Sequence, residues 1–290
     1  MTVVAGGVDG AEIEHLEELA RRIRVEIIRT VNHAQVGHLG GPLSAADILG
    51  ALYFRVLRIR PDEPHWASRD RFILSKGHSS LVQYAAMALR GYFPVTELRT
   101  FDSPGSRLQG HPDMKLLPGI DMSTGSLGMG LSAGLGMALA SRFTDVDPRV
   151  YVLLGDGECQ EGQVWEAAMV AARYGADNLV AIVDHNKLQQ YGWPGDSVDV
   201  RLPPQEPDEL VAKWSAFGWR VLETDGHEMR ALVAALEATA QTRGRPTVVI
   251  AHTVKGRGVS YMEGDYRWHS KPIDPEEFAL AMRELGEAQP

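Results

Sequence analysis

Two short apolar runs, 150–154 and 179–183, enclose a segment with a helical pattern at 163–174. Both runs are rich in β-branched residues and are too short for buried helices, so we interpret them as buried parallel strands. A right-handed crossover brings the carboxyl ends of two such strands to the same edge of a sheet. Asp156 and Asn186 follow the two strands. We therefore expect both side chains at that edge, where open α/β sheets bind their ligands.

Further strands and helices alternate along the rest of the chain. Strands are predicted at 71–75, 219–223 and 247–251, and helices at 12–34, 44–57, 79–90, 208–217 and 228–242. This alternation predicts an α/β fold with a doubly wound, mainly parallel sheet. Asp274 followed by a proline and two glutamates is a strong start for a terminal helix.

The length of 290 residues favours one large domain, expected at 11–290, behind a flexible N-terminal tail at 1–10. The segment 191–207 is rich in proline, glycine and aspartate, which predicts a long surface excursion near the functional site. The uncharged segment 122–141 approaches membrane-spanning length, but its glycines and hydroxyl side chains favour a buried loop and helix.

Charge and cysteine usage limit the partners and the compartment. The net charge is −9, which argues against a nucleic-acid partner because no basic phosphate-binding face is expected. The chain has one cysteine, Cys159, so a disulfide framework within it is excluded, and a reducing compartment fits. The N-terminus lacks the pattern of a signal peptide, and we expect a cytoplasmic enzyme that does not bind a membrane.

The residues at the predicted sheet edge suit a hard cation. A carboxylate from Asp156, a carboxamide from Asn186 and a nearby main-chain carbonyl form an all-oxygen set that Mg²⁺ or Ca²⁺ prefers. This set is too weak to hold the ion alone, so phosphate oxygens would complete its coordination. Gly155 and Gly157 flank the aspartate; they permit positive φ and allow a diphosphate to approach the backbone closely.

Four histidines occur in loops flanked by glycine or aromatic residues: His38, His78, His111 and His269. For one histidine a hydrogen-bonded structural role is the more common explanation, but four in similar loops suggest a shared pocket. Histidine donates hydrogen bonds to diphosphate or sugar hydroxyls when charged and transfers protons near neutral pH. Their spacing does not resemble a zinc site.

The series Gly155-Asp156-Gly157, Glu161-Gly162, Trp165-Glu166-Ala167 and Asp184-His185-Asn186 resembles the thiamin-diphosphate signature of the transketolase family. The resemblance extends over roughly residues 12 to 286, and segment 253–258 favours the animal and two-subunit branch. It implies the thiamin-diphosphate-binding fold of the diphosphate-binding domain. It also implies that Asp156, Asn186 and the carbonyl of Leu188 hold Mg²⁺ or Ca²⁺, which in turn holds the diphosphate of thiamin diphosphate.

The resemblance also implies roles for other residues. Residues that would contact the cofactor are Lys76, His78, Gly125, Ser126, Leu127, Gly157, Glu158, Asn186, Gln190, Lys255 and His269. Residues that would serve catalysis are His38, His78, His111, His269 and Glu161. Of these, His111 would hold the C1 hydroxyl of the donor sugar, and His38 and His269 would orient hydroxyls or help with proton transfer. Glu161 would approach the activating glutamate of another chain.

The family's pyrimidine-binding domain, which supplies that activating glutamate, has no counterpart here. The resemblance therefore implies the N-terminal subunit of a two-gene transketolase, which pairs with a C-terminal, pyrimidine-binding subunit to form an α2β2 heterotetramer. The expected reaction transfers a two-carbon ketol unit from a ketose or ketose phosphate to an aldose. The cofactor would act as the electron sink for that unit.

Three departures from the family's pattern keep alternatives open. Leu39 replaces a usual proline, Ser270 replaces a usual glycine, and segment 189–192 differs. One alternative is a transketolase-like subunit that passes the two-carbon unit to a nonstandard acceptor, such as a carrier protein in specialised metabolism. A second is a non-catalytic paralogue. Deoxyxylulose-phosphate synthase shares the fold, but its histidine loops differ.

Overall fold

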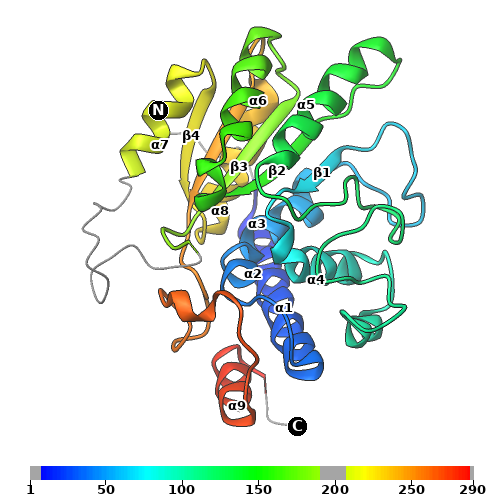
Figure 1. Ribbon diagram of the computed structural model, residues 1–290, viewed down its shortest axis with the longest axis vertical. Helices are drawn as coiled ribbons and strands as arrows, with labels where there is room; N and C mark the ends of the chain where they lie inside the picture. Colours follow the sequence, from blue (N-terminus) through cyan, green and yellow to red (C-terminus); the bar gives the residue numbers. More distant parts are fainter. Residues whose placement is uncertain (1–7, 190–206, 288–290) are drawn as a thin grey trace.

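The computed structural model describes residues 8–189 and 207–287, and its centre is a five-stranded parallel sheet (Figure 1). The strands lie in the order β1-β2-β3-β5-β4, and each adjacent pair is parallel. Their bounds are Arg71–Leu74 (β1), Val150–Gly155 (β2), Leu179–His185 (β3), Arg220–Asp225 (β4) and Thr247–His252 (β5). All five predicted strands are confirmed. The surface excursion expected at 191–207 lies outside the described residues, apart from Pro207.

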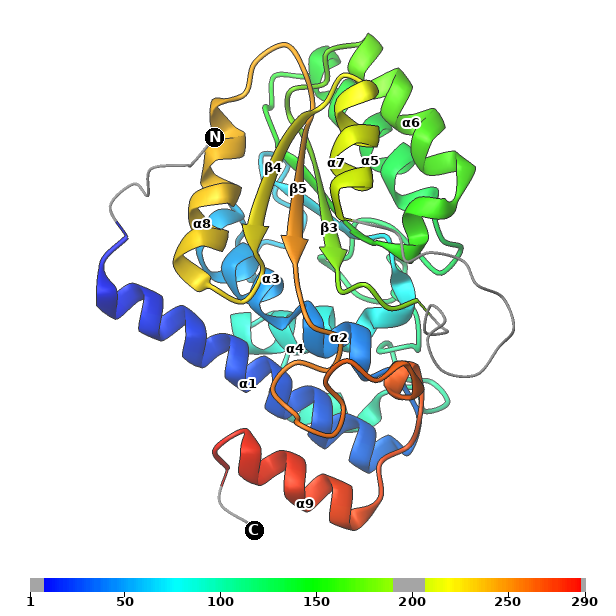
Figure 2. The ribbon, with the colours of Figure 1, turned by 90° about the vertical axis from the view of Figure 1, so that its left-hand side faces the viewer.

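Side chains of the central strands alternate between two hydrophobic cores. Tyr151 and Leu153 of β2 face a core built with helices α1 (Gly10–Ala34), α3 (Ala46–Ala51), α4 (Ser80–Arg90) and α8 (Met229–Ala238). Val152 and Leu154 face the opposite core, built with helices α5 (Met129–Ala140), α6 (Gly162–Arg173) and α7 (Pro207–Ala216). Figure 2 shows α8 on one side of the sheet and α5, α6 and α7 on the other. The doubly wound α/β fold is therefore confirmed.

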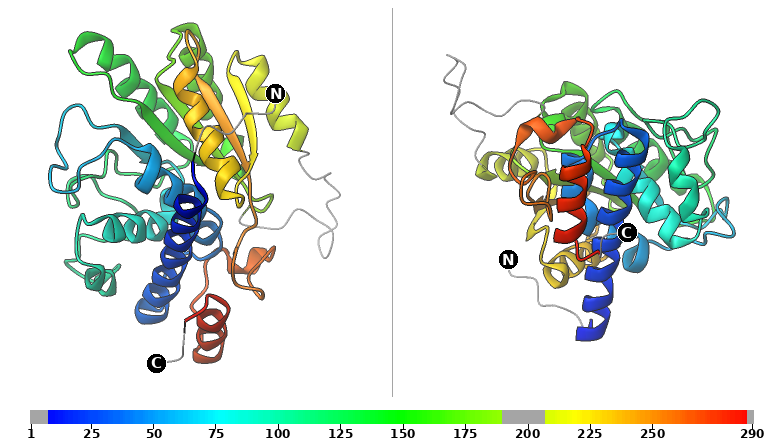
Figure 3. Two further views of the ribbon diagram at one scale, coloured as in Figure 1. Left: turned by 180° about the vertical axis from the view of Figure 1, so that it is seen from behind. Right: turned by 90° about the horizontal axis from the view of Figure 1, so that it is seen from below.

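The two ends of the described chain pack together. Helix α1 begins at Gly10, and Asp9 caps it by accepting a 2.8 Å hydrogen bond from the amide of Glu12. Of the tail expected at 1–10, Asp9 is therefore the N-cap of this helix and Gly10 its first residue. Helix α9 (Pro275–Glu284) begins with the predicted cap, Asp274, which forms a capping box with Glu277. It lies along α1, as the view from below shows (Figure 3).

Two predicted helices differ in detail. The segment expected to be one helix at 44–57 is divided into α2 (Gly40–Ser44), α3 and a π-helical turn (Leu52–Val56). The first break follows Ser44, whose hydroxyl lies 2.6 Å from the Asp184 carboxylate and 2.9 Å from the Gly41 carbonyl. A hydroxyl that bonds to carbonyls and side chains in this way competes with regular helix geometry. The helix expected at 228–242 ends at Ala238 and continues as one 3₁₀ turn, Thr239–Gln241.

The uncharged segment around 122–141 forms a loop followed by α5, as predicted. The loop is not buried as expected, however, because Ser123, Ser126 and Leu127 are exposed. Gly134 lies so close to β2 that an added Cβ would be 2.6 Å from a methyl group of Val152. This contact explains why a small residue is needed there. None of the helices in the described part of the chain combines the length and the apolar character needed to cross a bilayer.

Candidate active site

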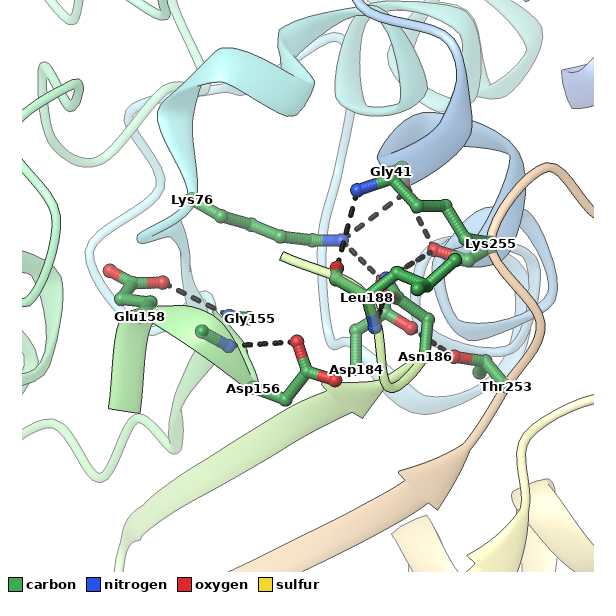
Figure 4. A network of polar contacts seen from close by, with 12 residues as sticks. Gly41, Lys76, Gly155, Asp156, Glu158, Asp184, Asn186, Leu188, Thr253 and Lys255 are labelled. Carbon is green, nitrogen blue, oxygen red and sulfur yellow. Dashed lines mark hydrogen bonds and ion pairs between the residues drawn. The ribbon is translucent and has the colours of Figure 1, made fainter. Parts of the chain in front are cut away.

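Asp156 and Asn186 lie at the carboxyl edge of the sheet, as predicted, and line one cavity of about 400 Å³. The two oxygens of Asp156 accept hydrogen bonds from the amides of Gly157 (2.7 Å) and Lys187 (2.6 Å). The side-chain oxygen of Asn186 accepts one from the amide of Leu188 at 3.1 Å. The bond from Lys187 ties the loop after β3 to the loop after β2, and the three predicted metal ligands lie close together there (Figure 4).

The donor set fits a hard divalent cation. Asp156, Asn186 and the Leu188 carbonyl offer only oxygen atoms, and each has accepting capacity left beyond its present hydrogen bond. Burial and the neighbouring Asp184 carboxylate raise the pKa of Asp156 to about 6, so the site favours a positive charge beside it. Within residues 8–189 and 207–287, no group of three or more His, Cys, Asp or Glu side chains is arranged to hold a metal ion.

The role expected of the glycines needs correction. Neither Gly155 nor Gly157 has a positive φ. Gly157 instead leaves space for a neighbour, because an added Cβ would lie 2.9 Å from Cγ of Gln189. The absence of a side chain there leaves the backbone beside Asp156 open to the cavity, which still suits the close approach of a diphosphate.

Asp184 is the polar centre beneath the cavity, and sequence reasoning did not select it. Its carboxylate is fully buried. It forms an ion pair with Lys76 and accepts hydrogen bonds from the hydroxyls of Ser44 and Thr253. Burial raises the pKa of Asp184, but Lys76 and the two hydroxyls outweigh this effect and lower it overall. A charged residue at the end of a continuous apolar strand was the available signal, because buried charges need partners.

Lys76 was predicted to bind the cofactor, and it does line the cavity. Its ammonium, however, is held by Asp184 and by the Gly41 carbonyl at 3.2 Å. Glu158, also predicted to bind the cofactor, likewise lines the cavity, and its buried side chain turns to the protein. Its carboxylate accepts hydrogen bonds from the amides of Gly128 (2.8 Å) and Gly155 (3.0 Å). Both residues therefore support the cavity wall.

Lys255 is the cation that reaches across the cavity. Its ammonium donates to the carbonyls of Leu188 at 3.2 Å and Gln189 at 3.1 Å and lies 2.9 Å from Nδ1 of His269. Burial and nearby Lys76 lower the pKa of Lys255 to about 8, although Asp156 opposes the shift. At neutral pH it carries a poorly hydrated positive charge beside the oxygen ligands, where an anionic group would be stabilised.

Three of the four selected histidines form a cluster. The ring centroids of His38, His78 and His269 lie 5.1 to 5.2 Å apart. Burial lowers the pKa of all three, to about 4, 2 and 3 respectively, with nearby cations and histidines adding to the effect. The cluster is therefore neutral at pH 7, unlike the charged histidines expected as diphosphate donors.

His111 lies apart from this cluster. It lines a neighbouring cavity of about 520 Å³, and His38 borders both cavities. Ser123 borders this second cavity, whereas Gly125 and Leu127 border the first, so the glycine loop at 123–128 lies between the two. All four histidines thus line two adjoining cavities that meet at His38.

The remaining predicted residues are distributed as follows. Gly125 and Leu127 line the first cavity, and Leu127 is 36% exposed. Ser126 is exposed and does not line it. Glu161 lies exposed just before α6, outside the cavity. Gln190 lies outside the described residues.

The comparisons with known proteins agree with this geometry. Residues 16–290 match the family model described as the transketolase, thiamine diphosphate binding domain. A 6-deoxy-6-sulfo-D-fructose transketolase subunit from Clostridium sp. (strain MSTE9) is 42% identical, covering 94% of this chain and 96% of that protein. An apulose-4-phosphate transketolase subunit from Phocaeicola vulgatus is 40% identical, covering 95% of both chains.

Longer transketolases match only in part. The human enzyme is 40% identical over 91% of this chain but only 41% of its own length. A crystal structure of a Pichia stipitis transketolase variant superposes with a TM-score of 0.85 at 30% identity, covering 95% of this chain and 42% of that one. The chain belongs to the transketolase family and comprises its thiamin-diphosphate-binding domain, at a length that matches separate transketolase subunits.

Proposed function

We propose that this chain is the N-terminal subunit of a split, thiamin-diphosphate-dependent transketolase. One observation carries the proposal: the oxygen atoms of Asp156, Asn186 and Leu188 share a cavity with Lys255 and the histidine cluster. An oxygen-lined cation site beside a buried lysine suits a metal-bound diphosphate. The neutral histidines next to it suit the hydroxyl-bearing substrate of a ketol transfer.

The residues of the site would have two separate roles, binding of the metal and diphosphate, and orientation and proton transfer at the substrate. Asp156, Asn186 and the Leu188 carbonyl would hold Mg²⁺ or Ca²⁺, and Lys255 with the backbone at Gly157 would receive the diphosphate. Bound thiamin diphosphate supplies an electron sink for the two-carbon unit. His38, His78 and His269 would orient hydroxyls and accept or return protons, because neutral imidazoles carry both a donor and an acceptor.

A second subunit would complete the site. Relatives that match along nearly their whole length are named as single transketolase subunits, whereas the human enzyme is more than twice as long. The partner would be a pyrimidine-binding subunit in an α2β2 assembly, and the complex would act in the cytoplasm. Glu161 would face that partner, because it is exposed and packs beside Gly128 next to the cavity wall.

The substrates would be a ketose or ketose phosphate and an aldose. The named relatives act on 6-deoxy-6-sulfofructose and apulose 4-phosphate. A nonstandard acceptor, such as a carrier-bound group, is a second candidate, because Ser270 alters the border of the second cavity. Its hydroxyl donates to the Gly37 carbonyl at 3.2 Å, and its backbone pairs with that of His38.

The test is reconstitution. The chain and the protein that co-purifies with it should be assayed separately and together, with thiamin diphosphate and Mg²⁺, for ketol transfer from a panel of ketoses to aldoses and carrier-bound aldehydes. We expect turnover only for the mixture, and an Asp156→Ala chain in the same mixture serves as the inactive control. Robust turnover by the lone chain would contradict a split enzyme. Turnover of carrier-bound acceptors alone would favour the second candidate.

A further inference from the structure

His227, which lies between β4 and α8 outside both cavities, is part of a buried polar chain that ends at the site. Its Nδ1 is 2.6 Å from a carboxylate oxygen of Asp47 on α3, and its Nε2 is 2.8 Å from the amide nitrogen of Val254. Asp47 is also held by both terminal nitrogens of Arg24 on α1. The side chains of Arg24, Asp47 and His227 are only 9 to 10% exposed.

The geometry fixes which nitrogen of His227 carries the proton. A backbone amide can only donate, so Nε2 accepts from Val254 and carries no hydrogen. Nδ1 must then be protonated and donate to Asp47, and Arg24 keeps Asp47 in its charged, accepting form. The chain of bonds therefore runs in one direction, from the Val254 amide to His227 and from His227 to the carboxylate.

Val254 belongs to the segment that carries the site's supporting side chains. The preceding residue, Thr253, donates to Asp184, and the following residue, Lys255, donates to the carbonyl of Leu188. The amide of Thr253 donates to the His185 carbonyl at 3.1 Å, and that of Gly256 to the Gly40 carbonyl at 3.0 Å. Both of those bonds join backbone to backbone. The Val254 amide, between them, donates to a side chain.

We propose that His227 is a positioning residue for the cofactor site, which sets the backbone of 253–255 so that Lys255 reaches the Leu188 carbonyl. This inference rests on the proposed function for its effect on cofactor binding. The part played by Asp47 and Arg24 is to hold the imidazole in one tautomer and one orientation. The other tautomer, with its proton on Nε2, would present an N–H to the Val254 amide and repel it, and a ring turned over would place a carbon there in place of the acceptor.

Two substitutions separate the bonds of His227. The amide nitrogen of asparagine falls near the position of Nδ1, so His227→Asn keeps a donor to Asp47 and leaves the Val254 amide unpaired. The amide oxygen of glutamine reaches the position of Nε2, so His227→Gln keeps the acceptor for Val254 and loses the donor to Asp47. His15→Asn, an exposed histidine on α1, is the matched surface control.

Calorimetry of the reconstituted complex should follow thiamin diphosphate binding at saturating Mg²⁺. We expect His227→Asn to raise the dissociation constant about five- to tenfold, the factor typical of one lost hydrogen bond. His227→Gln should stay within about twofold of wild type although it also lowers the melting temperature. Equal dissociation constants for the two variants would overturn the proposal.

Two measurements are independent of cofactor binding. Hydrogen exchange should show faster exchange at 253–256 in His227→Asn but not in His227→Gln, and equal protection in both would overturn the proposal. Nitrogen NMR of the wild-type chain should show His227 protonated at Nδ1 alone, so an Nε2-protonated or doubly protonated ring at neutral pH would also overturn it. Failure of the wild-type complex to bind thiamin diphosphate would refute the proposed function, while exchange and NMR would still decide the role of His227.

Discussion

Lys255 and His269 meet inside the cavity, with Nζ of the lysine 2.9 Å from Nδ1 of the histidine. The same ammonium donates to the Leu188 carbonyl at 3.2 Å, so one side chain joins the predicted metal loop to the histidine cluster. His269 has a lowered pKa because of burial and Lys255, and it therefore accepts from the lysine as a neutral ring. The oxygen site and the histidines are thus coupled through a single cation.

This coupling predicts a pH dependence of cofactor binding. Burial and Lys76 lower the pKa of Lys255 to about 8, so the lysine loses its charge as the pH rises above that value. Because this charge would hold the diphosphate, the dissociation constant of thiamin diphosphate should rise about tenfold between pH 7 and pH 9. Calorimetry at constant Mg²⁺ would measure this. Lys255→Met should bind more weakly and show no such slope; an equal slope in that variant would assign the titration to another group.

Metal binding should show the opposite trend. The pKa of Asp156 is raised to about 6 by burial and by Asp184, so protons compete with a cation below that pH. We expect the Mg²⁺ dissociation constant, measured with thiamin diphosphate present, to rise about tenfold for each pH unit below 6. Chelation of the metal should release the cofactor. Asp156→Asn should bind Mg²⁺ at least about tenfold more weakly, while Asp145→Asn, on the exposed surface, should behave as wild type.

The buried pair of Lys76 and Asp184 should be important for stability. Each side chain is at most 3% exposed, and removing one leaves an uncompensated buried charge. Lys76→Met or Asp184→Asn should each lower the free energy of unfolding by about 3–5 kcal/mol, and the double variant should lose much less than the sum. Urea denaturation of the four proteins would measure the coupling. Additive losses would show that the two charges do not depend on each other.

The sequence predicted the sheet and its functional edge because uninterrupted apolar runs leave few structures other than buried strands. It could place Asp156 and Asn186 for the same reason, since each lies shortly after the end of such a run. It could not identify Asp184 as the polar centre, because its partners Lys76, Ser44 and Thr253 come from distant segments. The neutrality of the histidine cluster also depends on burial, which loop sequences do not reveal.

The break in the predicted helix at 44–57 has the same origin. Local propensity favours a continuous helix there, but the hydroxyl of Ser44 is engaged by Asp184 of β3. A tertiary contact therefore decides the local structure.

Glu158 shows that a motif position does not reveal what a side chain contacts. Its position in a cofactor motif suggested a ligand contact, yet its carboxylate accepts hydrogen bonds from Gly128 and Gly155 and shapes the loop.

Glu161 should affect the assembled enzyme but not the fold of this chain. It is exposed, and an added Cβ on Gly128 would lie 2.7 Å from its own Cβ, so it sits against the start of α5 beside Leu127. Because its carboxylate makes no hydrogen bond within the described part of the chain, Glu161→Ala should change the free energy of unfolding by less than about 0.5 kcal/mol. In the reconstituted complex, Glu161→Ala should lower kcat. In the isolated chain, the same substitution should leave the affinity for thiamin diphosphate almost unchanged. Glu14→Ala, on the exposed face of α1, is the control. If both variants retain full kcat, Glu161 does not act at the interface with the partner.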